Sequence, residues 1–429
     1  MAASKVALAG LLAFAALAAP VPAQSPPAAH QLSTSNDERR ALAALQTAAA
    51  GTDRAAQDAA LAAARTAAQG ADARYVLARL EFQIAQSRGD AQGEAQAVDV
   101  LVASGLVPAD ELVPLLANQV MRAYSRSQFE RADALLAQMA QLRPTDGTIA
   151  ADYAQLKARR GQRAEAVTWI TRAIELQGAA NQAVPESWYL RAAALAYDGQ
   201  MMPQGVAFTR ALVAHYPNAT NWRDALLIYR ASQSPPPPPR SASGERPPAT
   251  PRPADAQLDL DIKRLMRASA ALAGERDYLE FADQLATADQ MGEAKAVLDE
   301  GVSRGMLDAS EAAVRQMRTR VTAAATRGRA GLAALRTRAA SGTGAQALAA
   351  ADTLYGYGDY AEAATLYRAA LQKTGGDANL VNTRLGAALA LAGRRADAEA
   401  ALHAVTGPRA DLAALWLVWL ARQPQASAT

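Results

Sequence analysis

The stretch from Gly358 to Leu371 reads GDYAEAATLYRAAL. It opens on a glycine and a short turn, and it continues as a helix with small residues at regular intervals. Alignment with the sequence that follows places Gly358 over Gly393 and Ala363 over Ala398, a spacing of 35 residues. The stretch is therefore one member of a repeating series, and not an isolated amphipathic helix.

The same unit recurs upstream, where Ala132 aligns with Ala166 at a spacing of 34 residues and Leu136 aligns with Ile170. Small residues where two helices cross let the backbones approach closely, and a glycine between the helices allows the positive φ of a tight turn. The alternative is a set of alanine-rich helices with coincidental spacing, but turn, small residue, bulky residue and proline would then have to coincide in several units.

This pattern resembles the tetratricopeptide repeat, in which two antiparallel helices form a unit of about 34 residues. The resemblance implies an all-α, TPR-like α-solenoid of antiparallel helix pairs. Trp188 and Trp222 fall close to the aromatic position early in the first helix. The small residues at the crossings are Ala132, Ala166, Gly205, Ala294, Ala363 and Ala398. The turn glycines are Gly161, Gly358 and Gly393, and the prolines after the second helix are Pro144 and Pro217.

The composition agrees with a helical chain whose core is built from alanine, leucine and valine. Of the 429 residues, 51% are apolar but only 5% are aromatic, and the formal net charge is +3. The chain contains no cysteine, which excludes a disulfide, a lipid-modified N-terminal cysteine and a cysteine nucleophile.

The N-terminus has the pattern of an export signal. Lys5 supplies a positive charge, Val6 to Ala19 is apolar, and small residues precede a cleavage site near Ala23. We expect residues 1–23 to be a signal peptide and the mature chain to reside in the periplasm. The alternative, an uncleaved anchor, needs about 20 apolar residues, and Pro20 and Pro22 end this run early.

A proline-rich tract, residues 233–254, interrupts the repeats. In the repeat register, the crossing position held by Gly205 next recurs at Asp261. The sequence separation of these two residues exceeds one 34-residue period by 22 residues, which is the length of the tract. We therefore predict a disordered loop insertion inside one repeat, with helices near residues 221–232 and 256–269 as its hairpin. The alternative is a linker between two independent domains.

The remaining segments complete the expected organisation. Residues 24–72 are expected to form an N-terminal helical cap or degenerate repeats. Residues 73–232 and 255–408 are expected to form TPR-like repeats, although residues 309–343 match the repeat poorly. Residues 409–429, which contain the apolar stretch DLAALWLVWLAR, are expected to form a C-terminal capping helix and tail.

The sequence offers no catalytic or metal-binding motif. His30, His215 and His403 are isolated, and neither a glycine-rich phosphate loop nor a G-x-S-x-G elbow is present. The acidic pairs Asp259/Asp261 and Asp299/Glu300 are expected to be solvated charges on helices. We predict that the protein is not an enzyme and uses no cofactor and no metal.

The resemblance to tetratricopeptide repeats implies a binding function, in which the first helices of successive units line a groove for a peptide or protein partner. The repeat register places Tyr124, Tyr197 and Tyr355 at one groove position, and Arg191 and Arg384 at another. Tyrosine suits recognition surfaces and arginine can hold a carboxylate with two hydrogen bonds. The alternative is that the tyrosines pack between repeats and the arginines are solvated.

A local basic run distinguishes residues 312–351, which contain no acidic residue. The run could face an acidic partner or anionic lipid headgroups, or it could be a solvated helix face. Nucleic acid is not an expected partner of an exported protein whose basic run lacks interleaved aromatic residues. The arginines are Arg315, Arg318, Arg320, Arg327, Arg329, Arg336 and Arg338.

These observations predict a periplasmic scaffold or adaptor that binds a protein or peptide partner in the solenoid groove, in cell-envelope assembly or maintenance. Two alternatives remain open at this point. One is an enzyme accessory or hydrolase whose site is assembled from scattered residues. The other is a peripheral envelope protein held by the Arg-rich segment 312–340, so that any membrane contact is at most peripheral.

Overall fold

The computed structural model describes residues 32–233, 253–373 and 376–424. Within these ranges the chain forms 21 α-helices and one short 3-10 helix, and it forms no strand. The chain divides into two compact units, residues 1–143 and residues 144–429, which are described separately below as unit 1 and unit 2. The predicted signal peptide and residues 234–252 of the proline-rich tract lie outside the described residues.

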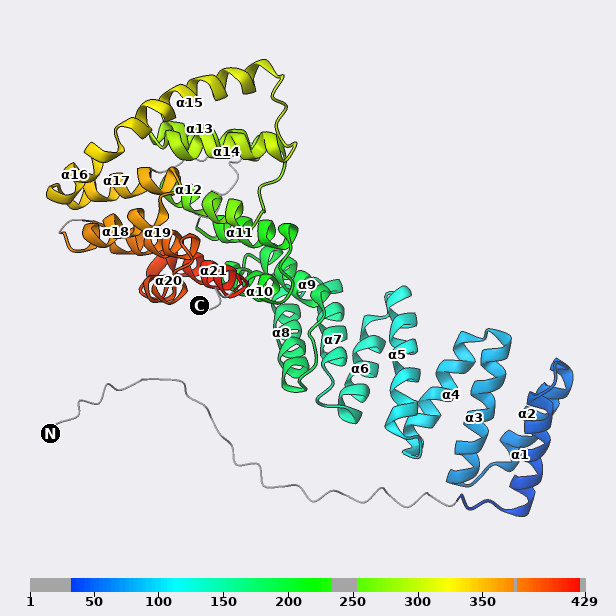
Figure 1. The fold of residues 1–429 in the computed structure, drawn as a ribbon. Helices are drawn as coiled ribbons and strands as arrows, with labels where there is room; N and C mark the ends of the chain where they lie inside the picture. Colours follow the sequence, from blue (N-terminus) through cyan, green and yellow to red (C-terminus); the bar gives the residue numbers. More distant parts are fainter. Residues whose placement is uncertain (1–31, 234–252, 374–375, 425–429) are drawn as a thin grey trace, which may run out of the picture. The chain divides into compact units, whose positions relative to one another are not determined.

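Unit 1 is a series of antiparallel helix pairs, α1 with α2, α3 with α4, and α5 with α6 (Figure 1). Apolar side chains such as Leu45, Ile84 and Leu116 fill the space between the helices. The helices are α1 Asn36–Ala49, α2 Arg54–Ala67, α3 Ala71–Arg88, α4 Ala91–Ser104, α5 Ala109–Ser125 and α6 Phe129–Leu142.

Unit 2 consists of further pairs and five helices that do not belong to these pairs, α11, α12, α15, α16 and α21. The pairs are α7 with α8, α9 with α10, α13 with α14, α17 with α18, and α19 with α20. The helices are α7 Gly147–Arg159, α8 Arg163–Ala179, α9 Glu186–Asp198, α10 Met202–His215, α11 Ala219–Gln233, α12 Pro253–Ala268, α13 Gly274–Thr287, α14 Met291–Ser303, α15 Ala312–Ala330, α16 Leu332–Ser341, α17 Gly344–Gly356, α18 Tyr360–Leu371, α19 Ala378–Leu391, α20 Arg395–His403 and α21 Ala410–Ala421; the 3-10 helix η1 covers Gly407–Arg409.

The predicted crossings are confirmed by burial. Each of the five alanines assigned to a crossing is 0% exposed, and Gly205 is buried as well. A side chain larger than alanine at these points would hold the paired helices apart. The predicted fold class, an all-α solenoid of TPR-like helix pairs, is therefore confirmed. The five alanines are Ala132, Ala166, Ala294, Ala363 and Ala398.

Most turns between paired helices contain one residue in the left-handed conformation. The predicted turn glycines Gly161 and Gly358 have φ of 73° and 83°, in the left-handed region. Ser127, Gln200 and Asp289 adopt the same conformation, with φ of 56°, 57° and 57°, in the corresponding turns of other pairs. Because these three residues have a Cβ, they occupy a backbone region that costs energy for any residue but glycine.

The middle of helix α12 is buried, which the sequence did not predict. Its residues 259–266 are buried without interruption, although the stretch DLDIKRLM alternates charged and apolar residues. The expectation that Asp259 and Asp261 are solvated was wrong, because α12 runs between other helices of unit 2. Helix α11 packs beside α12, and the Arg230 guanidinium lies 2.7 Å from the Asp259 carboxylate.

The C-terminal part of unit 2 folds back on its earlier helices. Helix α21 packs against α19 and α20 and also against α10. The Tyr229 hydroxyl donates to the Pro408 carbonyl at 2.9 Å, and the Trp419 indole N–H donates to the Ala268 carbonyl at 3.0 Å. These contacts join segments more than 150 residues apart in sequence.

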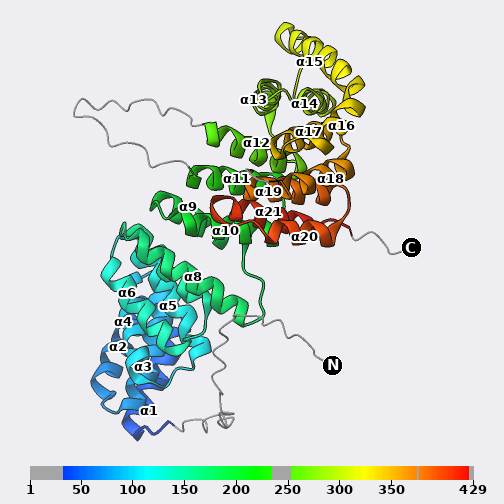
Figure 2. The same ribbon diagram turned by 90° about the vertical axis from the view of Figure 1, so that its left-hand side faces the viewer.

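The poorly matching segment 309–343 lies outside the regular stack. Helix α14 packs directly against α17, so α15 and α16 are not an intervening pair between them. Figures 1 and 2 both show α15 at the outer edge of unit 2. The weak repeat match of this segment therefore reflects its different position in the fold.

Candidate functional site

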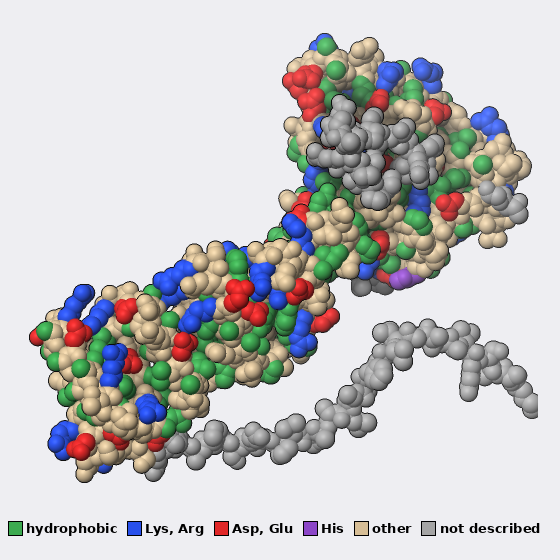
Figure 3. Space-filling model, turned by 180° about the vertical axis from the view of Figure 1, so that it is seen from behind, with side chains coloured by type: hydrophobic (Ala, Val, Ile, Leu, Met, Phe, Trp, Pro, Cys, Tyr) green, Lys and Arg blue, Asp and Glu red, His purple; other side chains and the backbone are tan. Residues whose placement is uncertain are grey.

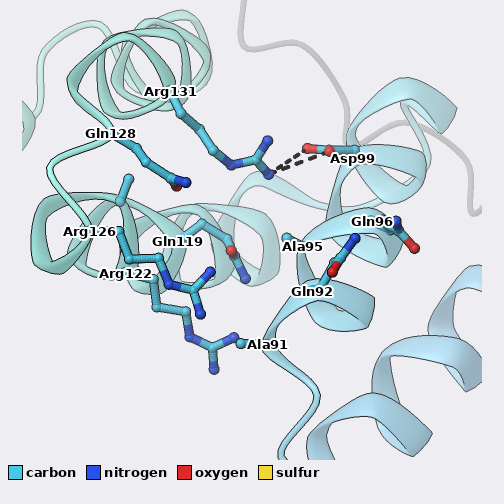
Figure 4. Close-up of a pocket in the computed structure, with 11 residues that line it drawn as sticks. Ala91, Gln92, Ala95, Gln96, Asp99, Gln119, Arg122, Arg126, Gln128 and Arg131 are labelled. Atoms are coloured by element: carbon cyan, nitrogen blue, oxygen red, sulfur yellow. Dashed lines mark hydrogen bonds and ion pairs between the residues drawn. The ribbon is translucent and has the colours of Figure 1, made fainter.

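Unit 1 contains a half-open pocket of about 370 Å³ between the second helices α4 and α6 and the end of the first helix α5 (Figure 4). Four glutamines and three arginines dominate its lining, with one carboxylate and small alanines between them. The polar residues are Gln92, Gln96 and Asp99 of α4, Gln119 and Arg122 of α5, Arg126 and Gln128 in the turn, and Arg131 of α6.

The helix period explains how this lining is assembled. Gln92 and Gln96 are four residues apart on α4, and Arg122 and Arg126 are four residues apart at the end of α5. Residues at this spacing lie on the same helix face. The alanines between them, such as Ala95, leave the space that the longer side chains surround.

Gln119 is the buried polar group of this pocket. Its residue is only 4% exposed, yet its side-chain amide has no hydrogen-bond partner among the described residues. Figure 4 shows the amide between α5 and α4, on the pocket side. Neither polar atom of this amide is fully buried without a partner, so its small exposed area lies at the pocket, where a ligand can reach it.

Positive charge exceeds negative charge around the pocket. Arg122 forms an ion pair with the buried Glu94, and Arg131 lies 3.3 Å from the Asp99 carboxylate. Arg126, which is exposed, has no acidic partner among the described residues. Helix α6 begins beside the pocket without a side-chain cap, so its N-terminal N–H groups add to the positive potential.

Unit 2 contains a buried ionic network centred on Asp261 of α12. The Asp261 carboxylate accepts hydrogen bonds from Arg384 at 2.9 Å, Arg409 at 2.6 Å and Arg264 at 3.3 Å. Burial raises the pKa of Asp261, but the three guanidinium groups outweigh burial and hold its pKa below the ordinary value. The network therefore keeps Asp261 ionised inside the protein.

Two further carboxylates balance the arginines. Asp352 accepts from Arg384 at 2.6 Å and from the Tyr367 hydroxyl at 2.6 Å, and Glu293 accepts from Arg264 at 2.7 Å. Three arginines thus face three carboxylates, so the network carries no uncompensated charge. Its members come from α12, α14, α17, α19 and η1, which makes it a structural link across unit 2.

A second recess, of about 580 Å³, opens over this network between α12, α13, α17 and α19. Leu260 and Leu348 form part of its walls, and Arg264, Asp352 and Arg384 reach its floor. All three charged groups are already satisfied within the network. The recess therefore offers mainly apolar contacts.

The predicted groove residues differ in exposure and in their contacts. Tyr124 and Tyr355 are each only 5% exposed, and the Arg264 guanidinium lies 4.5 Å from the centre of the Tyr355 ring. Arg384 belongs to the buried network, so its guanidinium is engaged within the protein. The remaining tyrosine, Tyr197, is 48% exposed on α9.

Arg191, the fifth predicted groove residue, is half-buried on α9, and its positive charge interacts with the carboxyl group of Asp152 on α7. Burial raises the pKa of Asp152 to about 6, and the positive charge of Arg191 partly offsets this effect. The pair lies within unit 2, away from the network around Asp261.

The basic run lies on the displaced helices α15 and α16, and most of its arginines have local partners. Arg318 lies 2.9 Å from Asp299, and Arg336 pairs with Asp359 and Glu362. In Figure 3, Lys and Arg side chains stand along the edge of unit 2 formed by these helices. Three of the other five also have contacts: Arg320 lies 4.0 Å from Asp283, Arg329 lies over the Tyr357 ring, and Arg315 donates to the Ser310 carbonyl. Arg327 and Arg338 are exposed and have no acidic partner among the described residues.

The second acidic pair that the sequence placed in solvent is also engaged. Asp299 and Glu300 are half-buried, and Glu300 lies 2.7 Å from Arg267. The expectation that this pair is solvated was wrong, because long basic side chains from neighbouring helices reach it. His215 and His403 are exposed at the ends of α10 and α20, and His30 lies outside the described residues.

Over the ranges that the structure covers, no cluster of three or more His, Cys, Asp or Glu residues is arranged to hold a metal ion. Among the helices of those ranges, none combines the length and the apolar character needed to cross a bilayer.

No family model and no curated protein matches the chain. Among solved structures, the chain is similar to Pseudomonas aeruginosa pilF, at 17% identity and a TM-score of 0.27, over 45% of this chain and 85% of that one. It is also similar to the TPR domain of P58(IPK), at 11% identity and a TM-score of 0.24, over 90% of this chain and 98% of that one.

Proposed function

We propose that this protein is an interaction scaffold that binds a peptide or protein partner, and that the pocket between α4, α5 and α6 is a binding site for that partner. The observation that supports the proposal is an open, polar pocket in whose lining the side-chain amide of Gln119 has no hydrogen-bond partner among the described residues. A bound segment would supply the hydrogen bonds that this amide lacks in the free chain.

The position of the pocket is consistent with this role. It lies on rigid helices and at the end of α5, where side chains that are not needed for packing between helices are free to meet a partner. The buried tyrosines of the expected groove, by contrast, serve the packing of their own units.

Site-specific photo-crosslinking in the native cell tests the proposal. A photoreactive residue at the exposed Gln96 is expected to capture a discrete protein partner, whereas the same residue at the exposed Arg74 of α3 is not. Capture that is equal at the two positions, or absent at Gln96, would contradict the proposal.

The predicted export signal makes the periplasm the proposed location, with a role in cell-envelope assembly or maintenance. Fractionation of the native cell, followed by N-terminal mass spectrometry, tests this part. The expected result is a periplasmic chain that begins at about residue 24. A chain in the cytoplasm that retains residues 1–23 would contradict it.

A second candidate function, peripheral attachment to an anionic membrane surface, is favoured by the placement of Arg327 and Arg338 on helices outside the stack. Retention on anionic vesicles at low ionic strength, with release at high ionic strength, would support it. The double variant Arg327→Ala/Arg338→Ala should then lose retention. Equal retention on neutral vesicles would exclude this mode.

A further inference from the structure

The pocket of unit 1 combines two kinds of group that point to one class of ligand. Its guanidinium groups favour a negative charge, and its glutamine amides each offer both a donor and an acceptor. An inorganic anion needs donors only. A peptide backbone needs donors and acceptors in alternation, which the amides of Gln92, Gln96, Gln119 and Gln128 can supply.

The charge balance indicates how many negative groups the ligand carries at this site. Glu94 is paired with Arg122 and Asp99 with Arg131, so Arg126 is the guanidinium left without an acidic partner among the described residues. One ligand carboxylate bound to Arg126 would give each of the three pocket arginines an acidic partner. The uncapped start of α6 strengthens the same preference, because the N-terminus of a helix attracts negative charge.

The volume of the pocket agrees with a short segment. About 370 Å³ lies at the lower end of the range of about 300–1,000 Å³ that ligand pockets occupy. The pocket is open on one side, so an extended chain can enter without displacing a helix.

We infer that this pocket binds an acidic peptide segment, with one Asp or Glu carboxylate on Arg126 and the peptide main chain on the amides of Gln119 and Gln92. This inference rests on the proposed function and adds the chemistry of the partner. The site lies on the second helices and the end of α5, and it uses none of the residues that the repeat register placed in the groove.

Fluorescence anisotropy on the full chain tests the inference with three labelled probes. The probes are a Gly/Ser/Ala peptide that carries Glu, the same peptide with Gln in place of Glu, and the same peptide with Lys. The Glu peptide is expected to bind best, and unlabelled succinate should compete only weakly, because it lacks the peptide backbone. Equal binding of the Glu and Gln peptides would overturn the inference.

Two variants locate the binding. Arg126→Ala removes a charged hydrogen-bond donor and should weaken binding of the Glu peptide roughly tenfold. The matched control is Arg74→Ala, which removes an equally exposed arginine of unit 1 and should leave binding unchanged. Binding that is unaffected by Arg126→Ala, but lost in Arg327→Ala/Arg338→Ala, would place the acidic peptide on α15 and α16 and overturn the inference.

Gln119→Leu separates a binding role from a structural one. Because the amide of Gln119 makes no hydrogen bond among the described residues, leucine should not lower the melting temperature, while it weakens binding of the Glu peptide. A lower melting temperature would show that Gln119 stabilises the fold, and the assigned role would be wrong.

The outcome of the crosslinking experiment keeps the two proposals distinct. A partner captured at Gln96, together with no preference for the Glu peptide, would leave the scaffold function standing and exclude an acidic segment. Failure to capture a partner at Gln96 would remove the proposed function itself. Succinate that binds as tightly as the Glu peptide would show a site for small carboxylates and would also overturn the inference.

Discussion

Glu38 shows how a single carboxylate organises the first helices. Its side chain accepts hydrogen bonds from the backbone N–H groups of Ser35, Gln69 and Gly70, at 2.7, 3.1 and 2.8 Å. It thereby completes the capping box of α1 and also holds the start of α3. The backbone donors, first that of Gly70, lower the pKa of Glu38 from 4.5 to about 2.

This shift predicts a dependence of stability on pH. A carboxylate whose pKa is lower in the folded chain contributes stability above its unfolded pKa of 4.5, and the contribution is lost as the pH falls towards about 2. Glu38→Gln should therefore melt at a lower temperature than the parent at neutral pH, and the difference should shrink in acid. A difference that stays constant from neutral pH to acid would show that the carboxylate charge is not the cause.

Asp261 is the residue on which the interior of unit 2 depends most. Its replacement by Asn removes the negative charge that faces Arg264, Arg384 and Arg409, all of which are buried. Breaking a buried ion pair by removing one partner costs about 3–5 kcal/mol. Asp261→Asn should lower the free energy of unfolding by that order in chemical denaturation. The paired control Asp58→Asn, at an exposed ion pair with Arg88, should cost less than about 1 kcal/mol.

At the scale of the helices, the crossings of small residues determine how closely pairs pack. Ala363 is 0% exposed on α18, where it packs in the core against α17, whereas Ala361 of the same helix is exposed. Ala363→Leu should overpack the crossing and lower the free energy of unfolding by about 1–3 kcal/mol. Ala361→Leu should change it little, since leucine and alanine have similar helix propensities. Equal stability of the two variants, measured by thermal unfolding, would contradict the assigned crossing.

At the scale of the whole chain, unit 2 is held together across the proline-rich tract. The Tyr229 hydroxyl of α11 donates to the Pro408 carbonyl, and α21 packs against α10 on the other side of the tract. The Arg210 guanidinium of α10 also lies 3.0 Å from the Asp411 carboxylate of α21. Unit 2 is therefore joined by contacts that do not depend on continuity of the chain at this point.

Cleavage within residues 234–252 tests this organisation. After proteolysis at an introduced site, the two fragments should elute together in gel filtration under native conditions. Raised ionic strength should not separate them, because the fragments share an apolar core in which Trp222 and Tyr229 pack with Leu260, and salt does not screen such contacts. Fragments that elute separately would show two independent domains joined by a linker.

Parts of the candidate site could have been read from the sequence. The i, i+4 spacing of Gln92 with Gln96, and of Arg122 with Arg126, predicts two polar helix faces. The sequence could not show that these faces meet, or that Gln119 is buried between them without a partner, because both facts depend on the packing of α4 against α5 and α6.

The sequence by itself determined the helix pairs, since a period of 34 or 35 residues is carried by local requirements: a small residue at each crossing and a left-handed turn between helices. Tertiary structure decided the rest. Asp261 and Arg384 are 123 residues apart, and only the return of the C-terminal helices towards α12 brings them into contact. A local pattern reports which residues neighbour each other within a helix pair. It carries no information on which charged side chains the folded chain encloses together. The packing of later helices around α12 buries its charges and turns them into a link to α14, α17, α19 and η1.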